Sequence, residues 1–210
     1  MPKSPTKRRP ATVAALTDSA QALFLERGFH ATSISDIVQR SGLTRGAFYS
    51  NWPDKEHLFL TLYDRHTERL LAELDEAAAT LGDTADPLEG LLEHVAGSSR
   101  RERAWFVLSM EFTLHAARHP EIAKSLAACE ERLVAGLAAL LADLLARGGR
   151  QPALPAADLA RVVMALSEGL NAHALTHPDA VTATGDLAKR TLPPVLRALS
   201  EPTPRVGSAG

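Results

Sequence analysis

Apolar residues recur along the chain at the spacing of amphipathic helices, in about nine segments that Gly and Pro separate. No stretch alternates apolar and polar residues in the way a half-buried strand does. The pattern therefore predicts an all-α fold of about nine helices, with one longer and two short helices at the N-terminal end and a larger helical part behind them.

The predicted helices span residues 12–27, two short segments before Pro53, and then 54–80, 87–97, 100–118, 121–147, 155–177 and 186–200. Residues 148–155 read as a loop, and residues 1–9 and 201–210 as disordered tails. Pro193 and Pro194 should kink or restart the last helix, because neither has a backbone N–H to donate.

Two of the short helices are joined by a tight turn. Ser33 is placed to cap the first of them, with Asp36 three residues later in an acidic variant of the capping box. Gly42 permits the positive φ of the turn, Leu43 fills the angle between the helices, and Thr44 caps the second helix, which we expect to continue through Asn51. Such a pair suits docking in the major groove of DNA.

The second helix of this pair presents a small, polar and cationic outer surface. An arginine there can donate to a guanine edge or a phosphate, a glycine lets the backbone approach closely, and a tyrosine hydroxyl can reach a phosphate. A lysine at the next helix start can engage a phosphate together with the backbone amides. The predicted DNA-binding residues are Ser33, Thr44, Arg45, Gly46, Tyr49, Ser50, Asn51 and Lys55.

Charge is divided unevenly between the two parts of the chain, although the net charge is only -2. Residues 1–55 carry eight basic and four acidic side chains, a net charge of +4, whereas the remainder carries 15 and 21, a net charge of -6. A basic end on an acidic body indicates that the first quarter meets a polyanion. The alternatives left open by charge and spacing are a charged disordered tail and an ordinary helical hairpin.

These residues resemble a known family. Phe29, Thr32-Ser33-Ile34, Asp36-Ile37 and the run from Ser41 to Tyr49, followed by Trp52, Lys55 and Leu58-Phe59, are similar to the N-terminal motif of TetR-type regulators. The resemblance covers roughly residues 12–60, with Trp52 where the family more often has Phe and Val38 where Ala is common. It implies a homodimer joined through the last two helices and an inducer pocket enclosed by the middle helices.

In this chain the dimer interface implied by the resemblance would use residues 155–177 and 186–200. Small residues at Ala165, Gly169 and Ala172 permit close helix approach. The alternative is that the apolar stripe beside them belongs to the intrachain core, and Pro193-Pro194 departs from a smooth final helix. The predicted interface residues are Leu159, Val162, Val163, Leu166 and Leu170.

A central helix concentrates bulky side chains that could line a ligand pocket or form solid core. Glu111 interrupts its apolar run, and because a buried carboxylate needs a partner, His115 four residues later is the one expected. The predicted pocket residues are Trp105, Phe106, Met110, Glu111, Phe112 and His115.

The histidines allow a weaker hypothesis of metal binding. His115 and His119, and again His173 and His177, are four residues apart, which a metal site permits. Since His119 and His177 each precede a proline at a predicted helix end, we instead expect them to contact terminal carbonyls, and we predict neither a metal nor a cofactor.

The sequence thus predicts a basic arm at residues 1–9, a DNA-binding domain at 10–55 and a ligand-binding and dimerisation domain at 56–200. With one cysteine, Cys129, and no apolar run approaching the ~20 residues of a membrane span, we expect a cytoplasmic protein without a membrane partner. The expected function is a dimeric repressor that binds an inverted-repeat operator in double-stranded DNA and is released by a small-molecule inducer. The alternatives are an activator on the same fold, and an all-helical metal-binding or small-molecule-binding protein or enzyme.

Overall fold

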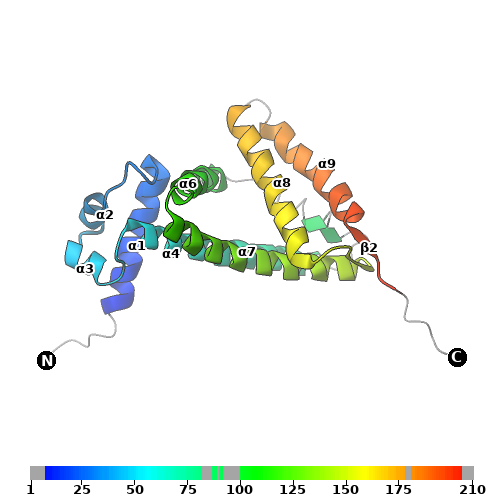
Figure 1. Ribbon diagram of the computed structural model, residues 1–210, viewed down its shortest axis with the longest axis horizontal. Helices are drawn as coiled ribbons and strands as arrows, with labels where there is room; N and C mark the ends of the chain where they lie inside the picture. The colour runs from blue at the N-terminus through cyan, green and yellow to red at the C-terminus, as the bar shows by residue number, and fades with distance from the viewer. Residues whose placement is uncertain (1–7, 82–86, 89, 92–99, 178–180, 205–210) are drawn as a thin grey trace. The chain divides into compact units, whose positions relative to one another are not determined.

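The computed structural model describes residues 8–81, 87–88, 90–91, 100–177 and 181–204. The predicted all-α fold is confirmed: these residues form eight helices and one pair of short strands (Figure 1). The helices are α1 (Arg8–Arg27), α2 (Ile34–Ser41), α3 (Arg45–Tyr49), α4 (Lys55–Thr80), α6 (Arg100–Ala116), α7 (Pro120–Arg147), α8 (Ala156–Thr176) and α9 (Val181–Ala198).

Most helix boundaries lie within two residues of those predicted, because capping residues and prolines mark them locally. α1 begins at Arg8, four residues before the predicted start, since Pro10 in its first turn needs no intrahelical donor. α9 begins at Val181, five residues before the predicted start at 186, and continues through Pro193 and Pro194, so the helix does not restart at these prolines as one alternative predicted. A helix was predicted over 87–97, and residues 87, 88, 90 and 91 are helical. Residues 89 and 92–97 lie outside the described part.

Two strands were not predicted. β1 (Arg150–Pro152) and β2 (Ser200–Pro202) pair antiparallel, with Gln151 opposite Glu201. The Arg150 side chain strengthens the pairing through Nε to Ser200 Oγ at 2.8 Å and Nη2 to the Ser200 carbonyl at 2.6 Å. The predictions of a loop at 148–155 and a disordered tail from 201 are therefore wrong over these residues, because partners about 50 positions apart leave no local pattern in the sequence.

The chain packs as two compact units, each with its own core. Unit 1 comprises residues 1–66 and 104–129, and unit 2 comprises residues 67–103 and 130–210. The helices α4, α6 and α7 each contribute residues to both units. Unit 1 thus contains α1–α3 and also most of α6. This division by packing differs from the functional domains predicted from the sequence, which meet at residue 55.

Unit 1 is built around aromatic side chains. Phe24, Phe29, Phe59 and Phe112 are each at most 1% exposed, and the Phe59 and Phe112 rings stack with their centroids 4.0 Å apart. Trp105 stacks on His66 at 4.2 Å. The Cys129 side chain is buried in the same cluster. These contacts join α1, α4 and α6 into one core.

Unit 2 has an aliphatic core in which α7, α8 and α9 meet. Leu144, Leu145, Leu159 and Leu196 are almost fully buried there. α8 and α9 lie side by side (Figure 1). Within the described residues, no helix has both the length and the apolar composition needed to cross a bilayer.

Candidate nucleic-acid interface

The turn between α2 and α3 is formed by local hydrogen bonds. The Ser33 hydroxyl accepts from the Asp36 amide at 3.2 Å, and the Asp36 carboxylate accepts from the Ser33 amide at 2.9 Å, so the predicted capping box is present. The Ser33 hydroxyl also donates to the Asp36 carboxylate at 2.5 Å, and this bond, together with that from the Ser33 amide, lowers the pKa of Asp36. Gly42 ends α2 with a φ of 69°, a left-handed conformation that glycine adopts without strain.

The candidate recognition helix, α3, is shorter than predicted. It spans five residues instead of about eight, and the Thr44 hydroxyl caps it by accepting from the Ala47 amide at 3.2 Å. Ser50 Oγ donates to the Gly46 carbonyl at 2.9 Å, and Asn51 Nδ2 donates to the Ala47 carbonyl at 2.8 Å. Ser50 and Asn51 therefore close the C-terminal end of α3, which corrects the expectation that they lie within it.

Arg45, Gly46 and Tyr49 form the exposed face of α3. Tyr49 is 49% exposed, whereas its neighbour Phe48 is fully buried and anchors the helix to the core. The Arg45 guanidinium lies 3.5 Å from the Tyr49 hydroxyl and has no carboxylate partner among the described residues. At Gly46 an added Cβ would meet only the Thr44 hydroxyl, at 3.7 Å. Within the described residues, the face thus offers a cation that no carboxylate neutralises, a hydroxyl and an unobstructed backbone.

Lys55 is placed differently from the prediction of a phosphate anchor. Its ammonium donates to the carbonyls of Phe29 at 2.7 Å and Thr32 at 2.8 Å, and it lies 4.2 Å from the centre of the Phe29 ring. Burial lowers the pKa of Lys55. Because two of its three N–H donors are directed into the protein, its role is to hold the segment between α1 and α2.

Comparison with known proteins identifies the family. The model of bacterial regulatory proteins of the tetR family matches residues 16–62, and that of the BetI-type transcriptional repressor C-terminal domain matches residues 84–192, about half of the chain. The chain belongs to the TetR family. It is a helix-turn-helix transcriptional regulator and not an enzyme.

Relatives of this regulator match over most of its length. The regulator TtgR of Pseudomonas putida is 30% identical over 189 residues, which cover 85% of this chain and 87% of that protein. A putative transcriptional regulator from Rhodococcus has the same fold, with a TM-score of 0.73, 20% identity and coverage of 89% and 95% of the two chains. A regulator from Saccharomonospora viridis, solved in complex with choline, has a TM-score of 0.64, 18% identity and coverage of 87% and 97%.

Two of the aromatic residues of α6 that were predicted to line an inducer pocket lie in a packed core. Trp105 and Phe112 are packed in the core of unit 1, with Phe112 fully buried. Phe106 is 9% exposed, and Met110 is partly buried. Trp105 and Phe112 are therefore core residues, the alternative left open for them, whereas a pocket role for Phe106 and Met110 stays a prediction. Glu111 and His115 also have other roles, described below.

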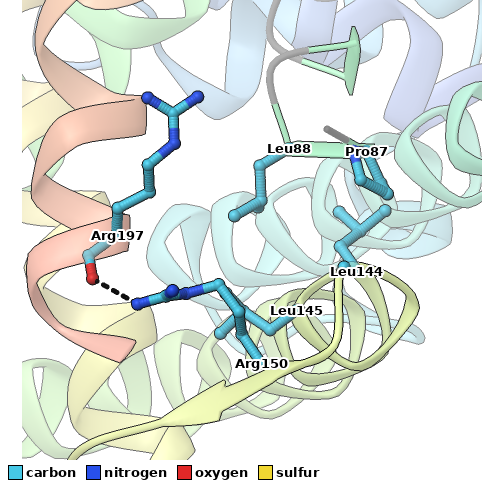
Figure 2. A pocket seen from close by; sticks show the side chains of 7 residues that line it. Pro87, Leu88, Leu144, Leu145, Arg150 and Arg197 are labelled. Carbon is cyan, nitrogen blue, oxygen red and sulfur yellow. Dashed lines mark hydrogen bonds between the residues drawn. The ribbon is translucent and has the colours of Figure 1, made fainter. Parts of the chain in front are cut away.

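A small pocket lies in unit 2, where the end of α7 meets α9 and β1. Its volume is about 160 Å³, and Figure 2 shows Leu88, Leu144 and Leu145 beside the Arg150 side chain, which donates to the Arg197 carbonyl at 2.9 Å. Ligand pockets for drug-sized molecules occupy about 300–1,000 Å³. This one is smaller, and Arg150 in its wall already makes structural hydrogen bonds.

The predicted dimer stripe on α8 divides into a buried and an exposed part. Leu159 is fully buried in unit 2 and Val163 packs against the same core, so both serve the intrachain packing. Leu166 is 37% exposed, and Val162 and Leu170 are partly exposed. Beside them Ala165, Gly169 and Ala172 are exposed, and a Cβ at Gly169 would meet nothing within 4 Å.

The four histidines predicted to occur in pairs stack on one another at helix ends. The His115 and His119 rings lie 4.3 Å apart, and those of His173 and His177 lie 4.1 Å apart. His119 Nδ1 lies 2.8 Å from the His115 carbonyl, and His177 Nδ1 lies 3.2 Å from the His173 carbonyl, as expected for histidines at helix ends. No group of metal-ligating side chains suited to a metal ion occurs in the part of the chain that the structure describes.

Glu111 has partners that its sequence neighbourhood did not indicate. Its carboxylate accepts from the backbone amides of Phe29 at 3.0 Å and His30 at 2.9 Å. The expected partner, His115, lies against Glu56 of α4 instead, with His115 Nε2 3.3 Å from Glu56 Oε1. The interrupted apolar run correctly indicated a carboxylate in need of a partner, but helical spacing could suggest only neighbours on the same helix.

Sequence reasoning also missed an ion pair that braces α1 against α2. The two terminal guanidinium nitrogens of Arg40, Nη1 and Nη2, each donate to the Glu26 carboxylate at 2.7 Å, a two-bond geometry that suits arginine. The hydrogen bond lowers the pKa of Glu26 and raises that of Arg40. Opposite charges 14 residues apart in a basic region carry no local signal, so only the packing of the two helices reveals them.

The surroundings of His115 indicate that the stability of the folded protein depends on pH. Burial lowers its pKa, with the charges of His119 and His30 adding to the effect and Glu56 opposing it. The unfolded chain therefore binds a proton at His115 more readily than the folded chain does. The free energy of unfolding is then highest above pH 6.5, the ordinary pKa of histidine, and decreases as the pH falls below that value. We expect urea unfolding between pH 7.5 and 5.5 to show a smaller loss of unfolding free energy in His115→Gln than in the unmodified protein. Equal losses would contradict this role.

Proposed function

We propose that this regulator is a dimeric repressor that reads an inverted-repeat operator with the exposed face of α3 and releases it on binding a small cation. The observation that carries the DNA-reading part is Arg45 on a capped helix-turn-helix: its guanidinium lies beside the exposed Tyr49 and has no carboxylate partner in the part of the chain that the structure describes. Arginine is the side chain best suited to a guanine edge, and a tyrosine hydroxyl suits a phosphate. Ser33 and Thr44 hold the two helices through their caps, and Gly46 admits the DNA backbone.

Repression is favoured over activation by the C-terminal half of the chain. The matching family model over residues 84–192 is that of a BetI-type transcriptional repressor, although relatives that match shorter stretches of the chain include an activator as well as a repressor. A dimer would place two copies of α3 on successive major grooves, about 34 Å apart. The exposed stripe of α8 around Leu166, with small residues beside it, suits the approach of a second copy.

A cationic ligand is suggested by two carboxylates of unit 2. Burial raises the pKa of Glu130 on α7, and the negative charge of Glu168 on α8 adds to the effect. Desolvation likewise raises the pKa of Glu168, and neither carboxylate has a cationic partner among the described residues. Glu130 is partly buried and Glu168 is at an exposed position, so a cation from solvent can approach both charges and offset their repulsion. Choline, the ligand in the S. viridis structure of the same fold, is a fitting probe.

The experiment uses an operator selected from random DNA and measures binding by fluorescence anisotropy. We expect choline chloride to release the regulator from this operator, and sodium chloride at the same concentration to release much less, because the ionic strength is then matched. A reporter gene placed behind the operator should be silent with the regulator present and expressed when choline is added. Expression that rises with the regulator alone would indicate an activator.

Two variants test the place of binding. Glu130→Gln and Glu168→Gln should lose the response to choline while retaining operator affinity, since each removes one of the charges that attract the cation. Glu131→Gln is the matched control, because Glu131 is already paired with Arg161 at 2.8 Å. If choline and sodium chloride act alike on the unmodified protein, the cationic ligand is excluded and the DNA-reading proposal is unaffected.

A further inference from the structure

The segment between α1 and α2 is held from outside by Glu111. After α1, Gly28 adopts a φ of 84°, and the next two amides, of Phe29 and His30, point at the same carboxylate at 3.0 and 2.9 Å. Successive backbone N–H groups after a left-handed residue form a concave anion site. Here the anion is a side chain of α6, more than 80 residues further along the chain.

The Glu111 carboxylate packs closely against Gly28. A Cβ at Gly28 would lie 2.7 Å from Glu111 Oε2, so the carboxylate occupies the space that any other residue would need. The opposite side of the same segment is also held, because Lys55 donates to the carbonyls of Phe29 and Thr32. Thr32 in turn donates through its hydroxyl to the Gly28 carbonyl at 2.9 Å. The backbone of residues 28–32 is thus fixed on both its amide and its carbonyl sides.

This segment leads directly into the DNA-reading helices. Thr32 is followed by Ser33, the N-cap of α2, and α3 follows one turn later. Any displacement of residues 28–32 therefore moves the start of α2 relative to α1. A helix placed 1 Å from its position loses the alignment that contacts with base edges require.

We propose that Glu111 is a positioning residue for operator recognition: its carboxylate, accepting the Phe29 and His30 amides, sets the orientation of α2 and α3. It touches no DNA in this proposal and acts through the backbone of residues 28–32. The inference rests on the proposed role of α3 in reading the operator. It assigns a function in DNA binding to a residue of α6, outside the helix-turn-helix.

The charge on Glu111 is central to the test. A glutamine has the same shape but only one acceptor oxygen, and its NH₂ group would face an amide N–H, donor against donor. We expect Glu111→Gln to lower operator affinity by about tenfold, the effect of one lost charge-assisted hydrogen bond, and Glu111→Ala to lower it further. Glu121→Gln, at an exposed position on α7, is the matched control and should bind normally.

Three measurements distinguish positioning from contact and from a merely structural role. The slope of log affinity against log salt concentration should stay unchanged in Glu111→Gln, because no phosphate contact is removed. Affinity for random-sequence DNA should also stay unchanged, so that only the ratio of specific to non-specific binding falls. Thermal unfolding is measured in parallel, and binding is compared well below the midpoint of each variant.

Each contrary result has a defined meaning. Unchanged operator affinity in Glu111→Gln, with or without a lower melting temperature, would overturn the proposal. A salt slope reduced by about one would also overturn it, because that change indicates a direct phosphate contact.

Arg45→Ala is measured beside Glu111→Gln to separate this inference from the proposed DNA-reading surface. If Arg45→Ala loses affinity and Glu111→Gln does not, only this inference fails; if Arg45→Ala also binds normally, the proposed DNA-reading surface fails. Should Glu111→Ala not fold, the isosteric Gln variant decides.

Discussion

Replacing Arg45 with alanine should weaken operator binding by about 10- to 100-fold, corresponding to ~1–3 kcal/mol for a base-edge contact. The fold should be unaffected, because the Arg45 side chain is exposed and, among the described residues, its guanidinium contacts the Tyr49 hydroxyl at 3.5 Å and no carboxylate. Fluorescence anisotropy against the selected operator measures the loss, and circular dichroism checks the fold. If Arg45 reads a base, discrimination at one operator position should relax; if it contacts a phosphate, the salt slope should fall by about one.

A second arginine provides the control. Arg40, on α2, is also exposed, but its guanidinium is already bound to Glu26 at 2.7 Å. We expect Arg40→Ala to change operator affinity much less than Arg45→Ala, since its charge is neutralised within the protein. Equal losses for the two variants would mean that binding depends on the total positive charge and not on the face of α3.

Replacing Phe59 with alanine should have the largest effect on stability, a loss of about 3–5 kcal/mol. Phe59 is fully buried and its ring stacks on Phe112 at 4.0 Å and lies parallel to Trp105 at 5.9 Å. Its removal leaves a cavity at the point where α4 and α6 meet α1 in the core of unit 1. Urea denaturation followed by circular dichroism gives the change in unfolding free energy.

Leu114 is the matched control for this loss. It is 64% exposed on α6, so that Leu114→Ala removes little buried surface and should change the unfolding free energy by no more than about 0.5 kcal/mol. A loss in Phe59→Ala no larger than that in Leu114→Ala would mean that the aromatic cluster does not stabilise unit 1.

The helix-turn-helix was predictable almost residue by residue, because short-range hydrogen bonds define it. Ser33, Gly42 and Thr44 act on amides or dihedral angles within three residues of themselves. Their roles follow from residue type and spacing, and the structure confirms each of them. Only the extent of α3 was misjudged, since Ser50 and Asn51 use their polar groups to end the helix.

The central helix shows where such reasoning stops. Spacing indicated correctly that Trp105 and Phe112 lie on an apolar face, but the same pattern fits a ligand cavity and a solid core equally well. Which of the two forms depends on the side chains that fill the space from other helices. Here Phe59 and Phe29 fill it, so this part of α6 serves as core.

What the sequence by itself determined is therefore the class of fold, the capped helix-turn-helix and its exposed cationic face, since all three depend on periodicity and contacts a few residues apart. Tertiary structure alone decided the partners of Glu111 and Lys55, the pairing of β1 with β2 and the burial of Leu159. Each of these joins residues at least 20 positions apart or depends on which face of a helix another element covers. Such contacts follow from the packing of the whole chain, which no local pattern records.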